Sequence, residues 1–369
     1  MSSIKEGGVV IVGGGPAGLS AAITAAKLGA PVTLIDDNTR LGGQLIKQSH
    51  KFFGARSHYC GMRGIDIANI LEQELAATKA NIILNTTVIG HFQPNILGLA
   101  DHHTFTRLSY RRFIVATGAT ENNILFENND LPGIYGAGAV QTLMNVFGVR
   151  PGRNVLMVGS GNIGLIVSYQ LLQASSNVVA IVEALPKIGG YHVHAAKLAR
   201  LGVPILTSHT IKSALGKEFV TGAIICRVNK NFKPIKGTEK RLKVDTICLA
   251  VGLSPLVELL SQIGCRMVYI PELGGQVAWH NENMETTVPG VYVAGDVSGV
   301  EEASTAMLEG RIAGAHAAGT FLGRFADSEK IITQAKLELS AIRQGPFGAK
   351  AAKGKEKMWH QGNIRFNEN

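Results

Sequence analysis

The chain has 369 residues, 46% of them hydrophobic and 17% charged, and its formal net charge is +9. This length predicts two or three domains with a substantial core, and the composition is typical of a soluble enzyme. The 44 glycines follow no three-residue period, which excludes collagen. The positive charge accompanies no recognised nucleic-acid-binding motif, so we expect no nucleic-acid partner.

An uncharged stretch near the start of the given sequence, residues 9–26, can be mistaken for a membrane span in a hydropathy scan. Its glycine cluster at 13–15 and the following Pro16 are instead typical of a strand-to-helix turn. An apolar strand precedes the turn, and Asp36 closes the next strand about twenty positions on. This order supplies a tight turn, a helix N-terminus for phosphates and a carboxylate for a ribose diol. We predict a first dinucleotide site here and no transmembrane segment.

The next part of the chain makes an excursion and then returns to a glycine. We expect a helix over 65–79, a strand-rich stretch over 82–112 and an apolar strand that leads into Ala116-Thr117-Gly118. The same order occurs a second time, which indicates an internal repeat. The second copy has a helix over 195–201 and a strand-rich stretch over 203–243.

A second glycine-rich turn opens this second copy. Gly159, Gly161 and Gly164 follow the apolar strand that starts at Val155, and Glu183 closes the next strand. One such turn is weak evidence, because glycine turns are common. Two turns, each in a full strand–turn–helix–strand–acid context, are strong evidence. The sequence therefore predicts that the protein binds two dinucleotides.

A third apolar strand ends at Gly295-Asp296, and a helix is expected over 301–318. Too little chain remains for a third domain, so we expect this strand to complete the first domain. The fold class is then α/β, with two Rossmann-like three-layer dinucleotide-binding domains, the second inserted into the first. The expected boundaries are 1–120 and 284–327 for the first dinucleotide-binding domain, 121–283 for the inserted second one, and 328–369 for a basic C-terminal tail.

These motifs, together with Leu41-Gly42-Gly43-Gln44, resemble the FAD- and NAD(P)-dependent pyridine nucleotide-disulfide oxidoreductase superfamily in its short, thioredoxin-reductase-like form. The resemblance implies FAD in the first domain, with Asp36 on the adenosine ribose and Asp296 on the ribityl chain. The full set implied for FAD is Gly13, Gly15, Pro16, Ala17, Gly18, Asp36, Asp37, Gly43, Gln44, Val88, Ala116, Thr117, Gly118, Gly295, Asp296, Glu302 and Ala303. The set implied for the nicotinamide cofactor is Gly159, Gly161, Asn162, Ile163, Gly164, Glu183, Val251 and Gly252.

The cysteines depart from the thioredoxin reductase pattern. The chain has four: Cys60, Cys226, Cys248 and Cys265. No two have a C-x-x-C spacing, so we predict an FAD- and NAD-dependent oxidoreductase that is not a dithiol reductase. Cys60 is either a lone redox thiol or a structural residue. The spacing fits a reducing cytoplasm, which is the location we expect.

Other motifs resemble a subgroup of this superfamily, the FAD- and NAD-binding subunits of multi-subunit amino-acid and amine dehydrogenases. They are Leu131-Pro132-Gly133, residues 138–143, Arg150-Pro151-Gly152 and residues 295–304. Members include sarcosine oxidase α, opine oxidase, hydrogen cyanide synthase and dye-linked L-proline or hydroxyproline dehydrogenases. This resemblance implies sister subunits, namely a second flavoprotein dehydrogenase, an iron–sulfur protein or both. The amine or amino-acid substrate is then expected on a sister subunit.

Two alternative functions and the oligomeric state stay open in the sequence. The chain could instead be a stand-alone NADH:acceptor reductase acting on a ferredoxin or quinone, or a nucleotide-holding assembly subunit without turnover. It could also form a homo-oligomer. For the nicotinamide cofactor we favour NAD over NADP, because Glu183 would repel a 2′-phosphate and only Lys187 follows it as a cation.

The candidates for direct chemistry are few. Gln44, Lys47 and His50 follow the first glycine turn and are weak catalytic candidates. The histidine pairs His192/His194 and His102/His103 have no third ligand at a suitable spacing, so we expect no metal site.

The C-terminal tail carries much of the excess charge. Residues 341–369 contain six Lys or Arg and two Asp or Glu, and Trp359 and Phe366 lie near the end. Two interpretations stay open: a solvated tail, or an arm that docks on an acidic partner. Both predict that removing residues 350–369 leaves FAD in place.

Overall fold

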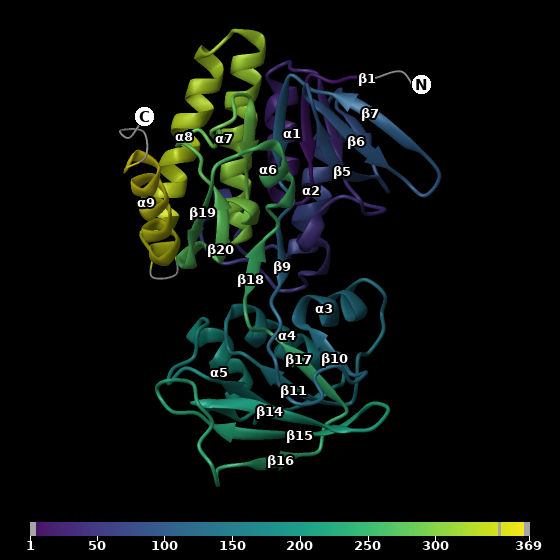
Figure 1. Cartoon of the computed structure of the whole chain (residues 1–369), viewed down its shortest axis with the longest axis vertical. Coiled ribbons are helices and arrows are strands. Elements are labelled where there is room, and N and C mark those ends of the chain that lie inside the picture. Colours follow the sequence, from purple (N-terminus) through teal and green to yellow (C-terminus); the bar gives the residue numbers. More distant parts are fainter. Residues whose placement is uncertain (1–4, 346–347, 365–369) are drawn as a thin grey trace. The chain divides into compact units, whose positions relative to one another are not determined.

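The computed structural model describes residues 5–345 and 348–364 and divides them into two compact units (Figure 1). Unit 1 combines the described residues up to Ile46, residues 51–120 and those from Leu253 on; unit 2 consists of residues 47–50 and 121–252. Phe366 lies outside the described residues. No helix among the described residues is long and apolar enough to span a bilayer.

A parallel five-stranded sheet forms the centre of unit 1, in the order β21-β8-β2-β3-β4. Its strands are β2 (Val9–Val12), β3 (Val32–Ile35), β4 (Asn81–Ile83), β8 (Arg112–Val115) and β21 (Val291–Val293). Every residue of β2 and β3 is buried. Such strands read as continuous apolar runs because both faces of the sheet are covered.

Helices and a second sheet cover this central sheet. The helices are α1 (Pro16–Lys27), α2 (Gly64–Ala76), α7 (Ala303–Leu322) and α8 (Ala326–Arg343). The second sheet has the order β1-β7-β6-β5, with β1 (Lys5–Glu6), β5 (Thr87–Phe92), β6 (Ile96–Ala100) and β7 (Phe105–Ser109). Leu97 and Leu108 of this sheet belong to the same hydrophobic core as Phe113 of β8.

Glycines allow α1 and α7 to pack backbone against backbone. A Cβ atom on Gly310 would lie 2.1 Å from the Ala17 carbonyl oxygen, and one on Gly314 would lie 2.4 Å from that of Ala21. Both distances are shorter than any real Cβ contact. The small-residue sequence of α7 is therefore explained by its close approach to α1.

Unit 2 is a three-layer α/β domain of its own. Its parallel sheet has the order β10-β17-β11-β12-β13, with β10 (Ile134–Gly136), β11 (Asn154–Val158), β12 (Asn177–Glu183), β13 (Ile205–Thr207) and β17 (Thr246–Leu249). The flanking elements are α3 (Ala137–Asn145), α4 (Asn162–Gln173), α5 (His192–Arg200), and the antiparallel strands β14 (His209–Gly216), β15 (Val220–Arg227) and β16 (Lys240–Leu242).

The side chains of β11 show how these layers form. Val155 and Met157 face the core shared with the helices, whereas Leu156 and Val158 face the core shared with β14 and β15. The alternation follows from the two-residue period of a strand.

The structure differs from the expected boundaries at the end of the insertion. Unit 2 ends at Gly252, whereas the sequence placed the end of the inserted domain at residue 283. The intervening chain forms β18 (Leu253–Pro255), which pairs with β9 (Ala119–Glu121), then α6 (Glu258–Ile263) and the hairpin β19 (Met267–Ile270) and β20 (Gly275–Ala278). Leu260 and Ile263 are buried in the core of unit 1, which explains why this segment belongs there.

The structure also differs from the expected basic tail. Residues 326–343 form α8, and residues 348–364 form a further helix, α9 (Gly348–Ile364), that packs on the β19–β20 hairpin and on the 3₁₀ turn η3 (Pro271–Leu273) (Figure 1). Ala351 and Met358 of α9 share a buried cluster with Leu273 and Val277. The apolar positions between the lysines therefore place this segment in the fold instead of in solvent.

Candidate functional site

The first glycine turn joins β2 to α1 and leaves a helix N-terminus open. Gly13 has φ +102°, and a Cβ atom there would lie 2.2 Å from the Ala116 carbonyl oxygen. A Cβ atom on Gly18 would lie 1.7 Å from the Gly13 carbonyl oxygen. Around Gly15, by contrast, the nearest atom is Gly43 Cα at 3.9 Å. Gly13 and Gly18 are thus needed by the fold, whereas Gly15 borders open space at the start of α1.

Asp36 supports this turn from the end of β3. Its carboxylate accepts hydrogen bonds from the Gly14 N–H and, at 2.8 Å, from the Asn38 N–H. Asp37 next to it is exposed. The Thr86 N–H donates to the Asp36 carbonyl oxygen at 3.1 Å, so β5, which carries Val88, starts beside this acid. The acid that closes β3 thus lies on the first glycine turn, and its role as a ribose ligand stays a prediction.

A glycine pair closes the far side of the first turn. The Gly42 N–H donates to the Gly14 carbonyl oxygen at 2.8 Å, and a Cβ atom on Gly43 would lie 2.7 Å from Gly15 Cα. Gln44 follows, exposed, in the short 3₁₀ helix η1 (Gly43–Lys47). The segment 41–44 therefore lies directly on the turn.

Two returning strands complete the first site. Beyond β8, the Ala116 N–H donates to the Val12 carbonyl oxygen at 2.8 Å, with Thr117 and Gly118 following. Beyond β21, Gly295 has φ +77°, and a Cβ atom there would lie 2.8 Å from Ala17 Cβ. The structure thus brings the segments 13–18, 36, 41–44, 116–118 and 295–296 together at one edge of the sheet.

Unit 2 repeats this construction at its own turn. A Cβ atom on Gly159 would lie 2.2 Å from the Ala250 carbonyl oxygen, and one on Gly164 would lie 2.2 Å from the Gly159 carbonyl oxygen, whereas nothing lies within 4 Å of Gly161. Asn162 and Ile163 start α4, and Val251 and Gly252 follow β17.

The acid of the second turn also matches the first. Glu183 accepts hydrogen bonds from the Ser160 N–H at 2.9 Å, the Ser160 hydroxyl at 2.8 Å and the Leu185 N–H at 2.9 Å. The Gly190 N–H donates to the Ser160 carbonyl oxygen at 2.9 Å, as Gly42 does at the first turn. The Gly189-Gly190 loop was not predicted. Its signal was the recurrence of an apolar residue followed by two glycines after each acid.

A family model described as pyridine nucleotide-disulphide oxidoreductase matches residues 7–310. The chain belongs to this family. The family binds FAD and NAD(P), and two complete dinucleotide turns in one chain fit these two cofactors. This pyridine nucleotide-disulphide oxidoreductase is therefore an oxidoreductase of the flavoprotein class, as the sequence predicted.

Three relatives match most of this chain. The alpha subunit of sarcosine oxidase from Corynebacterium sp. (strain P-1) is 28% identical and matches 84% of the chain, and an opine oxidase subunit from Rhizobium meliloti (strain 1021) is 29% identical and matches 82%. The HcnB subunit of hydrogen cyanide synthase from Pseudomonas protegens is 27% identical and matches 82%. The match covers 32%, 69% and 68% of these proteins, so the chain spans about a third of the sarcosine oxidase subunit. The predicted similarity to these subunits is confirmed.

Solved structures support the fold. Thioredoxin reductase from T. acidophilum has a TM-score of 0.71 at 22% identity, with 86% of this chain and 99% of that chain covered. L-proline dehydrogenase from P. horikoshii has a TM-score of 0.67 at 23% identity, with 91% and 60% covered. The predicted thioredoxin-reductase-like fold class is confirmed.

Asp296 starts the last segment of the first site in this oxidoreductase. It lies in the short 3₁₀ helix η4 (Asp296–Ser298), ahead of Glu302 and Ala303, where α7 begins. Burial raises the pKa of Asp296 to about 7, and Glu309 and Glu301 add to the shift against the opposing hydrogen bond from the Glu301 N–H. The carboxyl group is thus poised to donate or accept a hydrogen bond near neutral pH.

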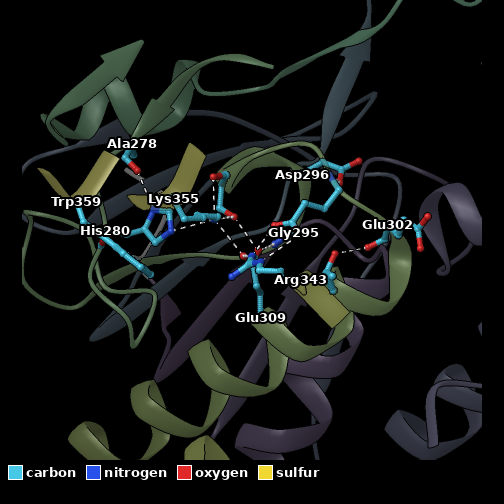
Figure 2. A network of polar contacts seen from close by, with 12 residues as sticks. Ala278, His280, Gly295, Asp296, Glu302, Glu309, Arg343, Lys355 and Trp359 are labelled. Atoms are coloured by element: carbon cyan, nitrogen blue, oxygen red, sulfur yellow. Dashed lines mark hydrogen bonds and ion pairs between the residues drawn. The ribbon is translucent and has the colours of Figure 1, made fainter. Parts of the chain in front are cut away.

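Sequence reasoning missed a buried acid behind this segment. Glu309 of α7 is 1% exposed, and its carboxylate accepts a hydrogen bond from the Gly295 N–H at 3.0 Å (Figure 2). Arg343 of α8 pairs with it at 2.7 Å and also with Glu301. Burial alone would raise the pKa of Glu309, but Lys355 and Arg343 outweigh burial and lower it. The available signal was an isolated acid inside a helix of small and apolar residues.

Lys47, one of the weak catalytic candidates, has hydrogen-bond partners within unit 2. Lys47 Nζ donates to the Gly138 carbonyl oxygen and to the Thr142 hydroxyl, both at 3.2 Å. Burial lowers the pKa of Lys47, an effect that Glu121 opposes. Burial, with smaller contributions from nearby cations, lowers the pKa of His50 to about 4, so this histidine is neutral at pH 7. The Lys47 side chain is held by these hydrogen bonds, and the catalytic roles of Gln44, Lys47 and His50 stay predictions.

The thiols and potential metal ligands complete the set of reactive side chains. All four cysteines are free; Cys60 is exposed, and the others are buried. Burial raises the pKa of Cys248 far above that of an ordinary thiol, so this residue is inert at neutral pH. Within residues 5–345 and 348–364, no group of three His, Cys, Asp or Glu side chains is placed to hold a metal ion.

Proposed function

We propose that this chain passes hydride or electrons between NAD(H), FAD and a partner redox centre, as one subunit of an amino-acid or amine dehydrogenase complex. The observation that carries the proposal is the presence of two equally complete dinucleotide turns in a chain without a C-x-x-C pair. Electrons collected by a flavin then need an acceptor outside this chain. The relatives support that conclusion, since their names describe them as subunits of oxidases and of a synthase.

The first turn is the proposed FAD site. The open space at Gly15 and the start of α1 suit a pyrophosphate, because the backbone can approach it and unpaired helix N–H groups face it. We assign the adenosine ribose to Asp36 and the ribityl chain to Asp296. When bound, FAD supplies two-electron chemistry, while the protein supplies position and electrostatics. The N-terminus of α7 favours negative charge on the bound flavin.

The second turn is the proposed NAD site. Gly161 borders open space in the same way as Gly15, and Glu183 lies at the end of β12, where a ribose diol is recognised in this fold. A carboxylate there repels a 2′-phosphate, which favours NAD over NADP. The Gly190 N–H donates to the turn of unit 2 at 2.9 Å, much as the Gly42 N–H does in unit 1 at 2.8 Å, and a loop held on the turn in this way suits a second candidate role. In that role the site retains an adenine nucleotide structurally and has no turnover.

The proposed partner proteins rest on the same argument, namely that the flavin needs an electron acceptor outside this chain. We propose a second flavoprotein dehydrogenase, an iron–sulfur protein or both as sister subunits, with a proline-, hydroxyproline-, sarcosine- or opine-type substrate on one of them. Purifying the native protein and identifying what accompanies it tests this assembly. A chain that purifies alone and reduces ferredoxin or quinone with NADH would instead be a stand-alone reductase. The cytoplasmic location stays a prediction.

We expect the purified chain to hold one non-covalent FAD, because no attachment motif is evident in the sequence. Denaturation should release the flavin into the supernatant, where chromatography identifies it as FAD. Flavin retained on the precipitated protein, or FMN alone in the supernatant, would contradict the assignment.

We expect NADH to reduce the bound flavin much faster than NADPH, and Glu183→Ala to narrow the difference. Rapid-mixing measurements of flavin bleaching give both rates. Glu218→Ala, an exposed acid on the same unit, is the matched control and should leave the ratio unchanged. Equal wild-type rates with the two cofactors would refute NAD selection, whereas no bleaching with either would favour the structural-nucleotide role.

A further inference from the structure

A lysine of the C-terminal helix lies inside unit 1. Lys355 of α9 is 2% exposed, although its neighbours Lys353 and Lys357 are exposed. Its Nζ donates to the Ser298 carbonyl oxygen at 3.0 Å and to the Ser298 hydroxyl at 2.9 Å. The ammonium also lies 3.0 Å from Glu309 Oε1 (Figure 2). A buried ammonium is costly unless it is paired, and here every partner belongs to unit 1.

A neutral histidine is the fourth partner of the ammonium, whose three N–H groups are therefore shared among four acceptors. Lys355 Nζ lies 3.1 Å from His280 Nε2, and His280 Nδ1 lies 2.9 Å from the Ala278 carbonyl oxygen. Burial, followed by Lys355, lowers the pKa of His280 to about 3. The imidazole is therefore neutral, with Nδ1 donating to the carbonyl and Nε2 accepting from the lysine.

The partners of Lys355 meet on one short segment of the first site. Glu309 directs its other oxygen, Oε2, to the Gly295 N–H at 3.0 Å and to the Ser298 hydroxyl at 2.7 Å. Lys355 thus contacts Ser298 directly and Gly295 through Glu309. Gly295 and Ser298 flank Asp296 in the chain, and Gly295 lies close to Ala17 of α1.

Arg343 cannot replace the lysine in this network. It pairs with Glu309 but shares its guanidinium with Glu301, and it makes no contact with Ser298 or His280 in the described hydrogen bonds. Loss of Lys355 would leave a buried carboxylate with one shared cation, and it would remove the donor to the Ser298 carbonyl. The segment 295–298 would lose both its direct contact with Lys355 at Ser298 and the indirect one through Glu309.

We propose that Lys355 is a positioning residue of the first dinucleotide site, which anchors α9 to the segment 295–298 and so fixes Gly295 and Asp296 for FAD. The proposal rests on the assignment of FAD to the first turn. It makes the C-terminal helix a working part of that site.

Hydrogen exchange of the flavin-free full-length chain, followed by FAD titration, tests the proposal. We expect Lys355→Met to accelerate exchange at the amides of residues 295–298 and to weaken FAD binding about tenfold or more, the loss expected when a buried partner is removed. Lys353→Met, the same change at an exposed position one half-turn away, should match the wild type. Met358→Ala, which removes packing but none of the polar network, should lower the thermal midpoint without changing exchange at 295–298.

Each result separates the possible roles. Wild-type exchange and wild-type FAD affinity in Lys355→Met would overturn the proposal. It would also be overturned if Met358→Ala changed the exchange at residues 295–298 and the FAD affinity as much as Lys355→Met does. If Lys355→Met does not fold, the double variant Glu309→Gln/Lys355→Met also removes the buried negative charge that Lys355 balanced, and wild-type exchange in it would likewise overturn the proposal. Failure of the wild type to bind FAD would refute the proposed function, but the exchange comparison would still decide the support of 295–298 by Lys355.

Discussion

Gly18→Ala should prevent unit 1 from folding, whereas Gly15→Ala should fold and fail to hold FAD. The added methyl group at Gly18 would lie 1.7 Å from the Gly13 carbonyl oxygen, and no side-chain rotation can relieve an overlap with backbone. We expect a loss of about 3 kcal/mol or more in the free energy of unfolding. At Gly15 the nearest atom is 3.9 Å away, and φ is −75°, which alanine adopts without strain.

Urea unfolding and the ratio of FAD to protein distinguish the two outcomes. For Gly15→Ala we expect a stability change below about 1 kcal/mol, the scale of a helix-cap replacement, together with at least about a tenfold loss of FAD affinity. Gly164→Ala and Gly161→Ala form the matching pair in unit 2, with 2.2 Å and no neighbour within 4 Å, respectively. Normal FAD content in Gly15→Ala would argue against pyrophosphate binding at this turn.

Ending the chain after Gly348 should remove FAD and destabilise unit 1. The deletion exposes the cluster of Leu273 and Val277 that Met358 covers, and it removes Lys355, which leaves Arg343 as the one cation paired with Glu309 in the described ion pairs. Loss of a buried methionine-sized side chain typically costs about 2–5 kcal/mol, and the loss of one of the two cations beside the buried carboxylate adds to this cost. The measurements are the urea midpoint and the FAD content of the purified chain.

A chain that ends after Ile364 is the control, and it should behave as the full-length protein does. The docking-arm interpretation of residues 341–369 predicts the opposite result for the longer deletion, namely normal FAD content and weaker assembly that depends on salt. Intact FAD and an unchanged midpoint after removal of α9 would restore that interpretation.

Local signals made most of the dinucleotide turns predictable from the sequence. Gly13, Gly18, Gly159 and Gly164 are required by close backbone contacts, and that requirement leaves a visible spacing. The acids Asp36 and Glu183 follow at a nearly fixed distance because one helix and one strand separate them from their turns. Such features depend on short stretches of chain, so a single sequence displays them.

The support behind the first site was not predictable in this way. Lys355 and Glu309 are far apart in the sequence, and a lysine among alternating glycines and lysines reads as solvated until its helix is seen to pack. The end of the insertion at Gly252 was misplaced for a related reason. Residues 253–283 carry no motif, and only their burial against the core of unit 1 assigns them.

Unit 1 is built from segments that lie far apart in the chain, so its parts leave the ribosome at different times. Apart from residues 47–50, unit 2 is a continuous segment, 121–252, whereas the sheet of unit 1 needs both β2 and β21, and its buried acid needs α8 and α9. Domains fold as their chains emerge, and contacts between distant segments form late. The nascent protein can therefore complete its second nucleotide domain first, while Phe113–Val115 of β8 wait on one side for their partner strand β21. FAD loading at the proposed site is accordingly expected only after β21, α8 and α9 have been synthesised.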